Sequence, residues 1–184
     1  MKTDSLKSVD APDRAELAAE LESLCAHPLT EVRIAAMPAF QLWDPSPDAD
    51  RARKVCLDAI KSPTQEERMC ALLLLLPRWK DADSARAVQS RIGTAGSETN
   101  RAKASLIEIG GPPAEETALA LLKRADANDQ TTRTSAIDIL EQVGGAKAAD
   151  ELRTHAMATE HQAVRNRALG AVIVIEARLR KTGP

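Results

Sequence analysis

Apolar residues recur along this chain at spacings of three, four and seven, which places them on one face of an α-helix. The clearest stripes are Ala36, Met37 and Phe40, and later Ala136, Ile137 and Leu140. The chain shows no sustained alternation of apolar and polar residues, which is the pattern typical of a strand. Short helix-breaking motifs separate the stripes: His27-Pro28, Ser62-Pro63, Gly96-Ser97, Asn128-Asp129 and GGPP at 110–113. The pattern therefore predicts an all-α protein with short turns.

One helical motif occurs four times, with an Arg, an Ala three residues later and an apolar residue seven later. Its segments are VRIAAMPAF, ERMCALLLL, TRTSAIDIL and VRNRALGAV, which begin their motifs at Arg33, Arg68, Arg133 and Arg165. A fifth segment, NRAKASLIEIGG, fits in two frames. Arg101 in the arginine position puts Glu108 where an apolar residue is due, whereas Thr99 there gives apolar positions to Leu106 and Ile109. We prefer the Thr99 frame because it buries the apolar residues.

A second amphipathic helix precedes each of these segments, so the sequence predicts five helix pairs. Their expected ranges are about 12–43, 48–79, 82–110, 113–143 and 146–180. One helix pair cannot bury both of its faces alone, and stacked neighbours complete the core. We therefore expect a single repeat domain over residues 12–184 and a disordered polar tail at residues 1–11.

The motif V/T-R-x-x-A, found at Val32–Ala36, Thr132–Ala136 and Val164–Ala168, resembles the HEAT-repeat family. It is most similar to the short bacterial HEAT-like repeats that also occur in phycobilin lyases. The resemblance covers roughly residues 12–180. It implies an α-solenoid of about five antiparallel helix pairs, wound as a right-handed superhelix in the manner of armadillo-like helical proteins. In such a superhelix the arginine-bearing helices would line the concave side.

Composition narrows the class of protein further. Aromatic residues make up 2% of the chain, so Ala and Leu must fill the interior. The formal charge of −2 lacks the excess of Lys and Arg that nucleic-acid binding normally requires. No apolar run reaches the roughly 18 residues that cross a bilayer, and no hydrophobic segment follows the first lysine. We expect a cytoplasmic protein that contacts neither membrane nor nucleic acid, with Cys25, Cys56 and Cys70 as buried reduced thiols.

Residue patterns for catalysis, cofactor binding or metal coordination are missing from the sequence. The three histidines, His27, His155 and His161, form no His-x-x-x-His series, and no Cys-x-x-Cys motif is present. Phosphate-binding loops and nucleophile elbows are missing as well. The repeated arginines have two interpretations. They form a basic stripe for an anionic ligand, or, as we prefer, they satisfy carbonyls and carboxylates between adjacent repeats.

These features favour a non-catalytic interaction module or scaffold that binds another protein through the solenoid surface. Positions one, five and eight after each arginine are expected to face the concave side, and they are mostly apolar in the first two pairs. Trp43 is expected in the core. Trp79, beyond Pro77, is expected to be partly exposed and either fills an edge or anchors a partner. The candidate partner-binding residues of this half are Ile34, Met69, Leu73, Leu76 and Trp79.

The last helix contains four consecutive β-branched residues, Val172 to Ile175. Successive helical residues point about 100° apart, so the four cannot all face the preceding pair. Val172 and Ile175 take the core positions, which leaves Ile173 and Val174 as candidates for self-association through the C-terminal helix.

Two other functions stay open at this point. Similarity of the repeats suggests a phycobilin-lyase-like enzyme that attaches a chromophore. HEAT-like proteins that bind nucleic acid and repair alkylated bases share the architecture, but they use a basic, aromatic-bearing concave surface that this composition does not provide.

Overall fold

A computed structural model describes residues 11–74, 79–94, 96–126 and 129–182 of the chain. Every regular element in these ranges is helical, which confirms the all-α prediction. The chain divides into two compact units, Met1–Trp79 and Lys80–Pro184. The predicted tail lies outside the described residues apart from Ala11, which instead begins the first helix. Pro12 accounts for this start, because Pro is favoured in the first turn of a helix.

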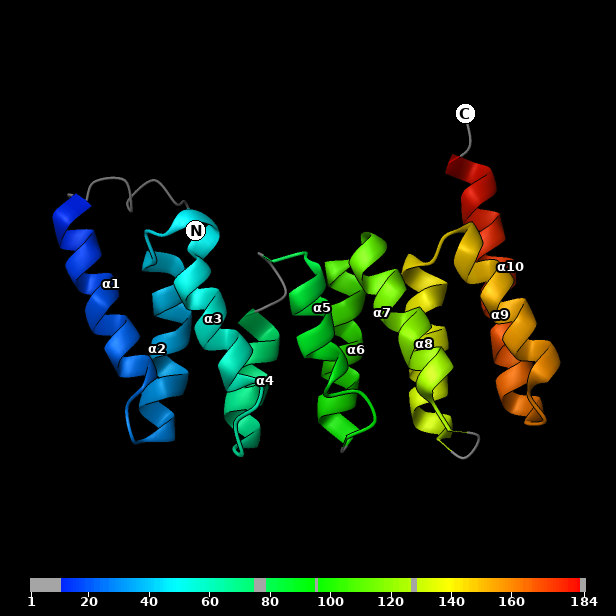
Figure 1. Ribbon diagram of the computed structural model, residues 1–184, viewed down its shortest axis with the longest axis horizontal. Coiled ribbons are helices and arrows are strands. Elements are labelled where there is room, and N and C mark those ends of the chain that lie inside the picture. Colours follow the sequence, from blue (N-terminus) through cyan, green and yellow to red (C-terminus); the bar gives the residue numbers. More distant parts are fainter. Residues whose placement is uncertain (1–10, 75–78, 95, 127–128, 183–184) are drawn as a thin grey trace. The chain divides into compact units, whose positions relative to one another are not determined.

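Unit 1 contains four α-helices in its described part, shown in blue to green in Figure 1. They are α1 (Ala11–Cys25), α2 (Thr30–Trp43), α3 (Asp50–Ala59) and α4 (Gln65–Leu74), with a short 3-10 helix, η2 (Pro47–Ala49), before α3. α1 packs mainly against α2, whereas α2 packs against both α3 and α4. The buried centre of the unit includes Met37 and Phe40 from α2 and Ala71 and Leu72 from α4.

The connection between α2 and α3 adopts an unusual backbone conformation. Asp48 and Ala49 have φ values of 51° and 53°, in the left-handed region that residues other than Gly rarely adopt. Ala49 is the N-cap residue of α3, and its methyl group cannot accept a hydrogen bond. Asp44 caps the helix instead. Its Oδ2 accepts a hydrogen bond from the Ala52 N–H at 2.8 Å, and its Oδ1 accepts one from the Ser46 N–H at 2.9 Å. A carboxylate from the end of α2 therefore holds the first turn of α3.

Trp79 packs against the connection between α2 and α3. Its Nε1 donates a hydrogen bond to the Asp48 carbonyl at 2.6 Å, and the residue is 4% exposed. The expected partial exposure of Trp79, and with it the role of partner anchor, is therefore wrong, because the indole is part of the unit 1 interior. Trp43, expected in the core, is half-buried instead.

Unit 2 contains six α-helices in its described part, which alternate between two rows. They are α5 (Ala82–Gln89), α6 (Gly96–Ile109), α7 (Gly111–Arg124), α8 (Gln130–Val143), α9 (Ala146–Ala158) and α10 (Gln162–Thr182). Each helix packs against its pair partner, as α9 does against α10 in Figure 1. Helices also pack across pairs, α5 on α7 and α7 on α9 in one row, α6 on α8 and α8 on α10 in the other. This pattern of helix–helix contacts is typical of a helical repeat.

The degenerate third segment follows the Thr99 frame. Leu106 and Ile109 are buried and Glu108 is exposed. The Thr99 hydroxyl donates to the Thr94 carbonyl at 3.0 Å and accepts a hydrogen bond from the Gly93 N–H at 3.2 Å. Thr99 therefore bonds to the turn that precedes its helix, which is what the arginines of the other segments do.

The alanines of the repeated motif occupy the helix contacts predicted for them, since Ala36, Ala71, Ala136 and Ala168 are all buried. We expect Ala136→Leu to overpack the contact around α8 and to lower the free energy of unfolding by about 2 kcal/mol. Urea denaturation followed by circular dichroism measures this loss. Thr131→Leu, at an exposed position on the same helix, is the control and should change the stability little. An equal loss in both variants would contradict close packing at Ala136.

Candidate functional site

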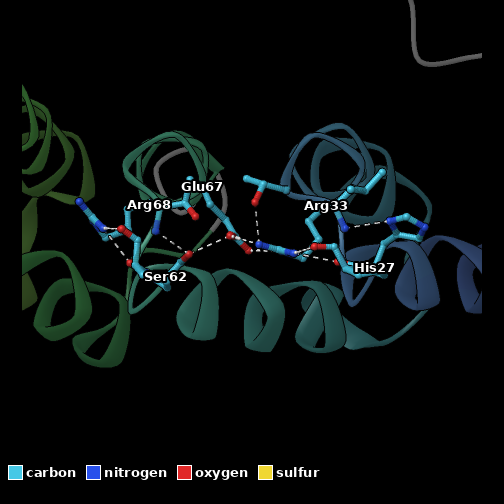
Figure 2. Close-up of polar contacts among 10 residues, drawn as sticks. His27, Arg33, Ser62, Glu67 and Arg68 are labelled. Carbon is cyan, nitrogen blue, oxygen red and sulfur yellow. Dashed lines mark hydrogen bonds and ion pairs between the residues drawn. The ribbon is translucent and has the colours of Figure 1, made fainter.

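A polar network joins the two helix pairs of unit 1, and Figure 2 shows its members. The Arg33 guanidinium forms a bidentate ion pair with the Glu67 carboxylate, to which its Nε donates at 2.9 Å and its Nη2 at 2.8 Å. Its Nη1 donates to the His27 and Pro28 carbonyls at 2.8 and 3.0 Å. The Ser62 hydroxyl also donates to Glu67, at 2.8 Å. Arg33 thus connects the turn of its own pair to the first turn of α4.

The Glu67 carboxylate stays ionised in this setting. The hydrogen bond from Arg33 lowers the pKa of Glu67 below its usual 4.5, burial acts in the opposite direction, and the Ser62 hydroxyl adds to the lowering. The same bond raises the pKa of Arg33. Because both groups remain charged near neutral pH and are fully engaged with each other, this guanidinium is not available to an anionic ligand.

The other repeated arginines bind turn carbonyls. Arg68 donates to the Ser62 and Pro63 carbonyls at 2.7 and 2.8 Å, as Figure 2 shows, and Arg165 to the Thr159 and Ala156 carbonyls at 2.7 and 3.1 Å. Arg133 reaches the Ala125 carbonyl at 3.5 Å. These carbonyls lie in the connecting turn or the last helical turn before each arginine's own helix, whereas the predicted bond between adjacent repeats is made by Arg33 to Glu67. The arginines reach these carbonyls because the connection places them directly beside the first turn of the second helix.

A cavity of about 500 Å³ lies next to this network and is lined by residues of α1, α2, α3 and α4. Four of its charged lining residues are paired, since Glu22 bonds to Arg51 and Arg33 to Glu67, and Lys54 and Asp58 line it as well. Cys25 lines the cavity from the end of α1. The cavity therefore offers charges of both signs and a thiol.

The three cysteines are free thiols, and their surroundings do not activate them. Burial, with a smaller effect of Cys70, raises the pKa of Cys25 to about 11. Burial also raises the pKa of Cys56 to about 12, and that of Cys70, where the nearby Glu67 charge adds to the effect. All three thiols are protonated near neutral pH, whereas nucleophilic attack and metal ligation need the thiolate. Within the described residues, no group of three or more His, Cys, Asp or Glu side chains is arranged to hold a metal ion.

The second helices of unit 1 bear an apolar surface. Leu73 is 50% exposed on α4, and Ile34 and Met69 are half-buried. The Gln41 amide donates to the Leu74 carbonyl at 2.8 Å, and the Cys70 thiol lies 3.8 Å from the Ile34 carbonyl, so α2 and α4 lie against each other here. We call the exposed face formed by Ile34, Pro38, Met69 and Leu73 the α2–α4 surface.

The remaining candidate residues fall in different places. Leu76 lies outside the described residues. Ile173 and Val174 are exposed on α10 of unit 2, while Val172 and Ile175 are buried as predicted. Leu42, which is 50% exposed on α2, and the buried carboxylate of Asp44 were not predicted from the sequence. The signal for Leu42 is its place four residues after Pro38, because this spacing puts both on one face of α2.

Neither a family model nor a curated protein sequence matches this chain. Among the described helices, none is long and apolar enough to cross a membrane. The fold itself defines the class, which is an all-α protein built from repeated helix pairs.

Proposed function

We propose that this protein is a non-catalytic interaction module of the HEAT-repeat type that binds another protein through the α2–α4 surface. The observation that carries the proposal is the exposure of Leu73 in the middle of an apolar face formed by two helices. Contiguous exposed apolar surface is unfavourable in water and commonly marks a binding site. The Arg33–Glu67 pair and Gln41 supply polar groups beside it. An apolar centre with a polar edge is the usual composition of a protein interface.

The geometry suits a partner with an apolar stripe of its own. Two neighbouring helices present Ile34 and Pro38 on one side and Met69 and Leu73 on the other. An amphipathic helix inserts its apolar side chains between such rows through positions i, i+3, i+4 and i+7. The pairing order of the helices in both units, with its repeated arginine–turn contacts, supports the assignment to HEAT-like repeats and to a solenoid.

Replacing Leu73 with Glu tests this proposal. A charge in the centre of the interface should weaken partner binding by about 30-fold or more, which is the effect of losing one binding hot spot. Because Leu73 is half exposed, the far-ultraviolet circular dichroism and the melting temperature should change little. Binding is measured by affinity capture from a lysate of the source cells, followed by titration of the captured protein.

Leu24→Glu is the matched control. Leu24 is 41% exposed, similar to Leu73, and it lies on α1, which contributes no residue to the α2–α4 surface. The proposal requires a protein that wild type and Leu24→Glu retain and that Leu73→Glu loses. Equal retention by all three proteins would refute the α2–α4 surface as the binding site. Loss of helical signal in Leu73→Glu would show that Leu73 supports the fold instead.

A further inference from the structure

The outer face of α10 in unit 2 is apolar and uncovered. One side of this 21-residue helix packs against α8 and α9. The opposite side exposes Leu169, Ile173 and Val174, and Ile173 is 65% exposed. A shallow hollow of about 350 Å³, lined in part by Met157 of α9 and by Leu169, extends the apolar area beside it. Three exposed β-branched or leucine side chains within two helical turns are a strong signal of a surface that another molecule covers.

Gly170 lies in the middle of this face, and nothing within its own unit requires a glycine there. Gly is less favourable than Ala inside a helix, yet a Cβ added at Gly170 would meet no atom within 4 Å. Ala163 and Ala177, seven residues to either side, are exposed too. Seven residues make about two turns, so a small residue at every seventh position leaves a line along the helix surface without protruding side chains. Another helix can approach α10 closely along this line.

We propose that α10 is a homodimerisation helix, which packs antiparallel against α10 of a second copy of this chain. The argument for a second copy is that the face is complementary to itself. A two-fold axis that crosses the helix between residues 171 and 172 places Ile173 of each copy opposite Gly170 of the other. Each protruding side chain then fits the gap that the other copy provides, as knobs fit holes in a helix pair, and the interface is isologous.

The same rotation extends the fit beyond the centre. It places Ala177 opposite Asn166 of the second copy and Ala163 opposite Arg180, so that a larger side chain again meets a small one at both ends of the contact. A partner of unrelated sequence would need the reverse pattern of large and small residues at the same spacing, whereas a second copy already carries it.

Charge selects the antiparallel orientation. Arg180 and Lys181 lie at the C-terminal end of α10. The N-terminal end bears the neutral residues Gln162 and Asn166 on this side, and the charge of the exposed Arg167 is neutralised by Asp138 of α8. The nearby Glu176 is paired with Arg153 of α9. A parallel dimer would bring the cations of both copies together, which is unfavourable, whereas an antiparallel dimer sets each basic end beside a neutral one. Antiparallel helix dipoles also attract each other.

The apolar centre of the contact is short. From Leu169 to Ala177 the helix rises about 12 Å at its usual 1.5 Å per residue. Standard stable dimers bury about 800 Å² on each partner, and a contact of this length on one helix is smaller than that. We therefore expect a weak dimer that forms at high micromolar concentration and dissociates on dilution.

Analytical ultracentrifugation of the full chain over a dilution series tests the dimer. Wild type should pass from monomer to dimer as its concentration rises. Ile173→Lys with Val174→Lys should raise the dissociation constant by at least about 100-fold, because two charges would be buried without partners. Leu29→Lys, the same change at a similarly exposed leucine of unit 1, should leave the dissociation constant unchanged. A wild type that is monomeric throughout the series would overturn the proposal and leave the face to a different partner.

A pair of glycine variants tests the packing and the orientation. Gly170→Ile fills the gap without touching the monomer, so the fold should persist and the dimer should be lost. Gly170→Ile combined with Ile173→Gly exchanges the protruding side chain and the gap within one chain. In the antiparallel dimer the exchange restores the fit, and the dissociation constant should return to within about 10-fold of wild type. No recovery in the exchange variant, or an undiminished dimer in Gly170→Ile, would overturn this arrangement.

Discussion

Asp44→Ala is expected to lower the free energy of unfolding by about 3 kcal/mol, because two hydrogen bonds to a buried charged acceptor are lost. The Asp44 carboxylate is 2% exposed and accepts from the backbone N–H groups of Ser46 and Ala52. After the substitution the Ala52 N–H, in the first turn of α3, is left buried without an acceptor. Urea denaturation at neutral pH measures the loss. Asp50→Ala, which removes an exposed carboxylate from the same helix end, is the control and should change the stability by less than about 1 kcal/mol.

The stability that Asp44 provides should disappear in acid. Burial by itself raises the pKa of Asp44, but the hydrogen bonds from Ala52 and Ser46 outweigh it, and the net pKa lies below the usual 3.8. A folded-state pKa below the unfolded one means that the stabilisation is complete above about pH 3.8 and is lost as the pH falls through the folded value. Wild type and Asp44→Ala should therefore converge in stability at low pH. A difference that stays constant down to low pH would contradict the role of the ionised carboxylate.

Arg33→Ala is expected to lower the melting temperature by about 5 °C or more. The Glu67 side chain, which is 8% exposed, would lose the guanidinium that neutralises it, and the His27 and Pro28 carbonyls would lose a donor. An ionised carboxylate left without its cation is more destabilising than the loss of both members of the pair. Arg33→Ala combined with Glu67→Gln should therefore regain part of the melting temperature. Differential scanning calorimetry measures all three proteins.

Arg165→Ala distinguishes the effect of an arginine's bonds to backbone carbonyls from the effect of its ion pair with a carboxylate. Arg165 binds the carbonyls of Ala156 and Thr159 in the way that Arg33 binds its turn. Its removal should lower the melting temperature without altering the pH dependence. Arg33→Ala should also reduce the loss of stability in acid, because Arg33 is the main cause of the lowered pKa of Glu67. An identical acid response of wild type and Arg33→Ala would show that the ion pair does not couple to folding.

The helices and most of the buried face of each could be predicted because both depend on residues a few positions apart. Ala36 and Ala136 are buried where the spacing of three, four and seven placed them. The choice of Thr99 over Arg101 for the third segment rested on the same local criterion. Ile173 and Val174 were predicted to point outward from the angle between successive helical residues alone, and they are exposed.

Features that depend on contacts between distant residues were not predicted. Trp43 and Trp79 end equivalent helical patterns, yet Trp79 is buried because its indole reaches Asp48, 31 residues earlier. Gly144 ends α8 with a φ of −69°, which any residue can adopt, so its backbone conformation does not require a glycine. Its requirement is spatial, since an added Cβ would lie 2.6 Å from the Cβ of Ala148.

The sequence by itself determined that this protein is all-α, where its helices lie and which alanines pack between them, because helix formation and amphipathic burial are set within about two turns of chain. The tertiary structure alone decided which polar side chains became interior partners, such as Asp44 for α3 and Arg33 for Glu67. It also decided that Leu73 and Gly170 stand uncovered. These outcomes depend on which helix lies beside which, and that arrangement follows from the packing of whole helices, which no local spacing encodes.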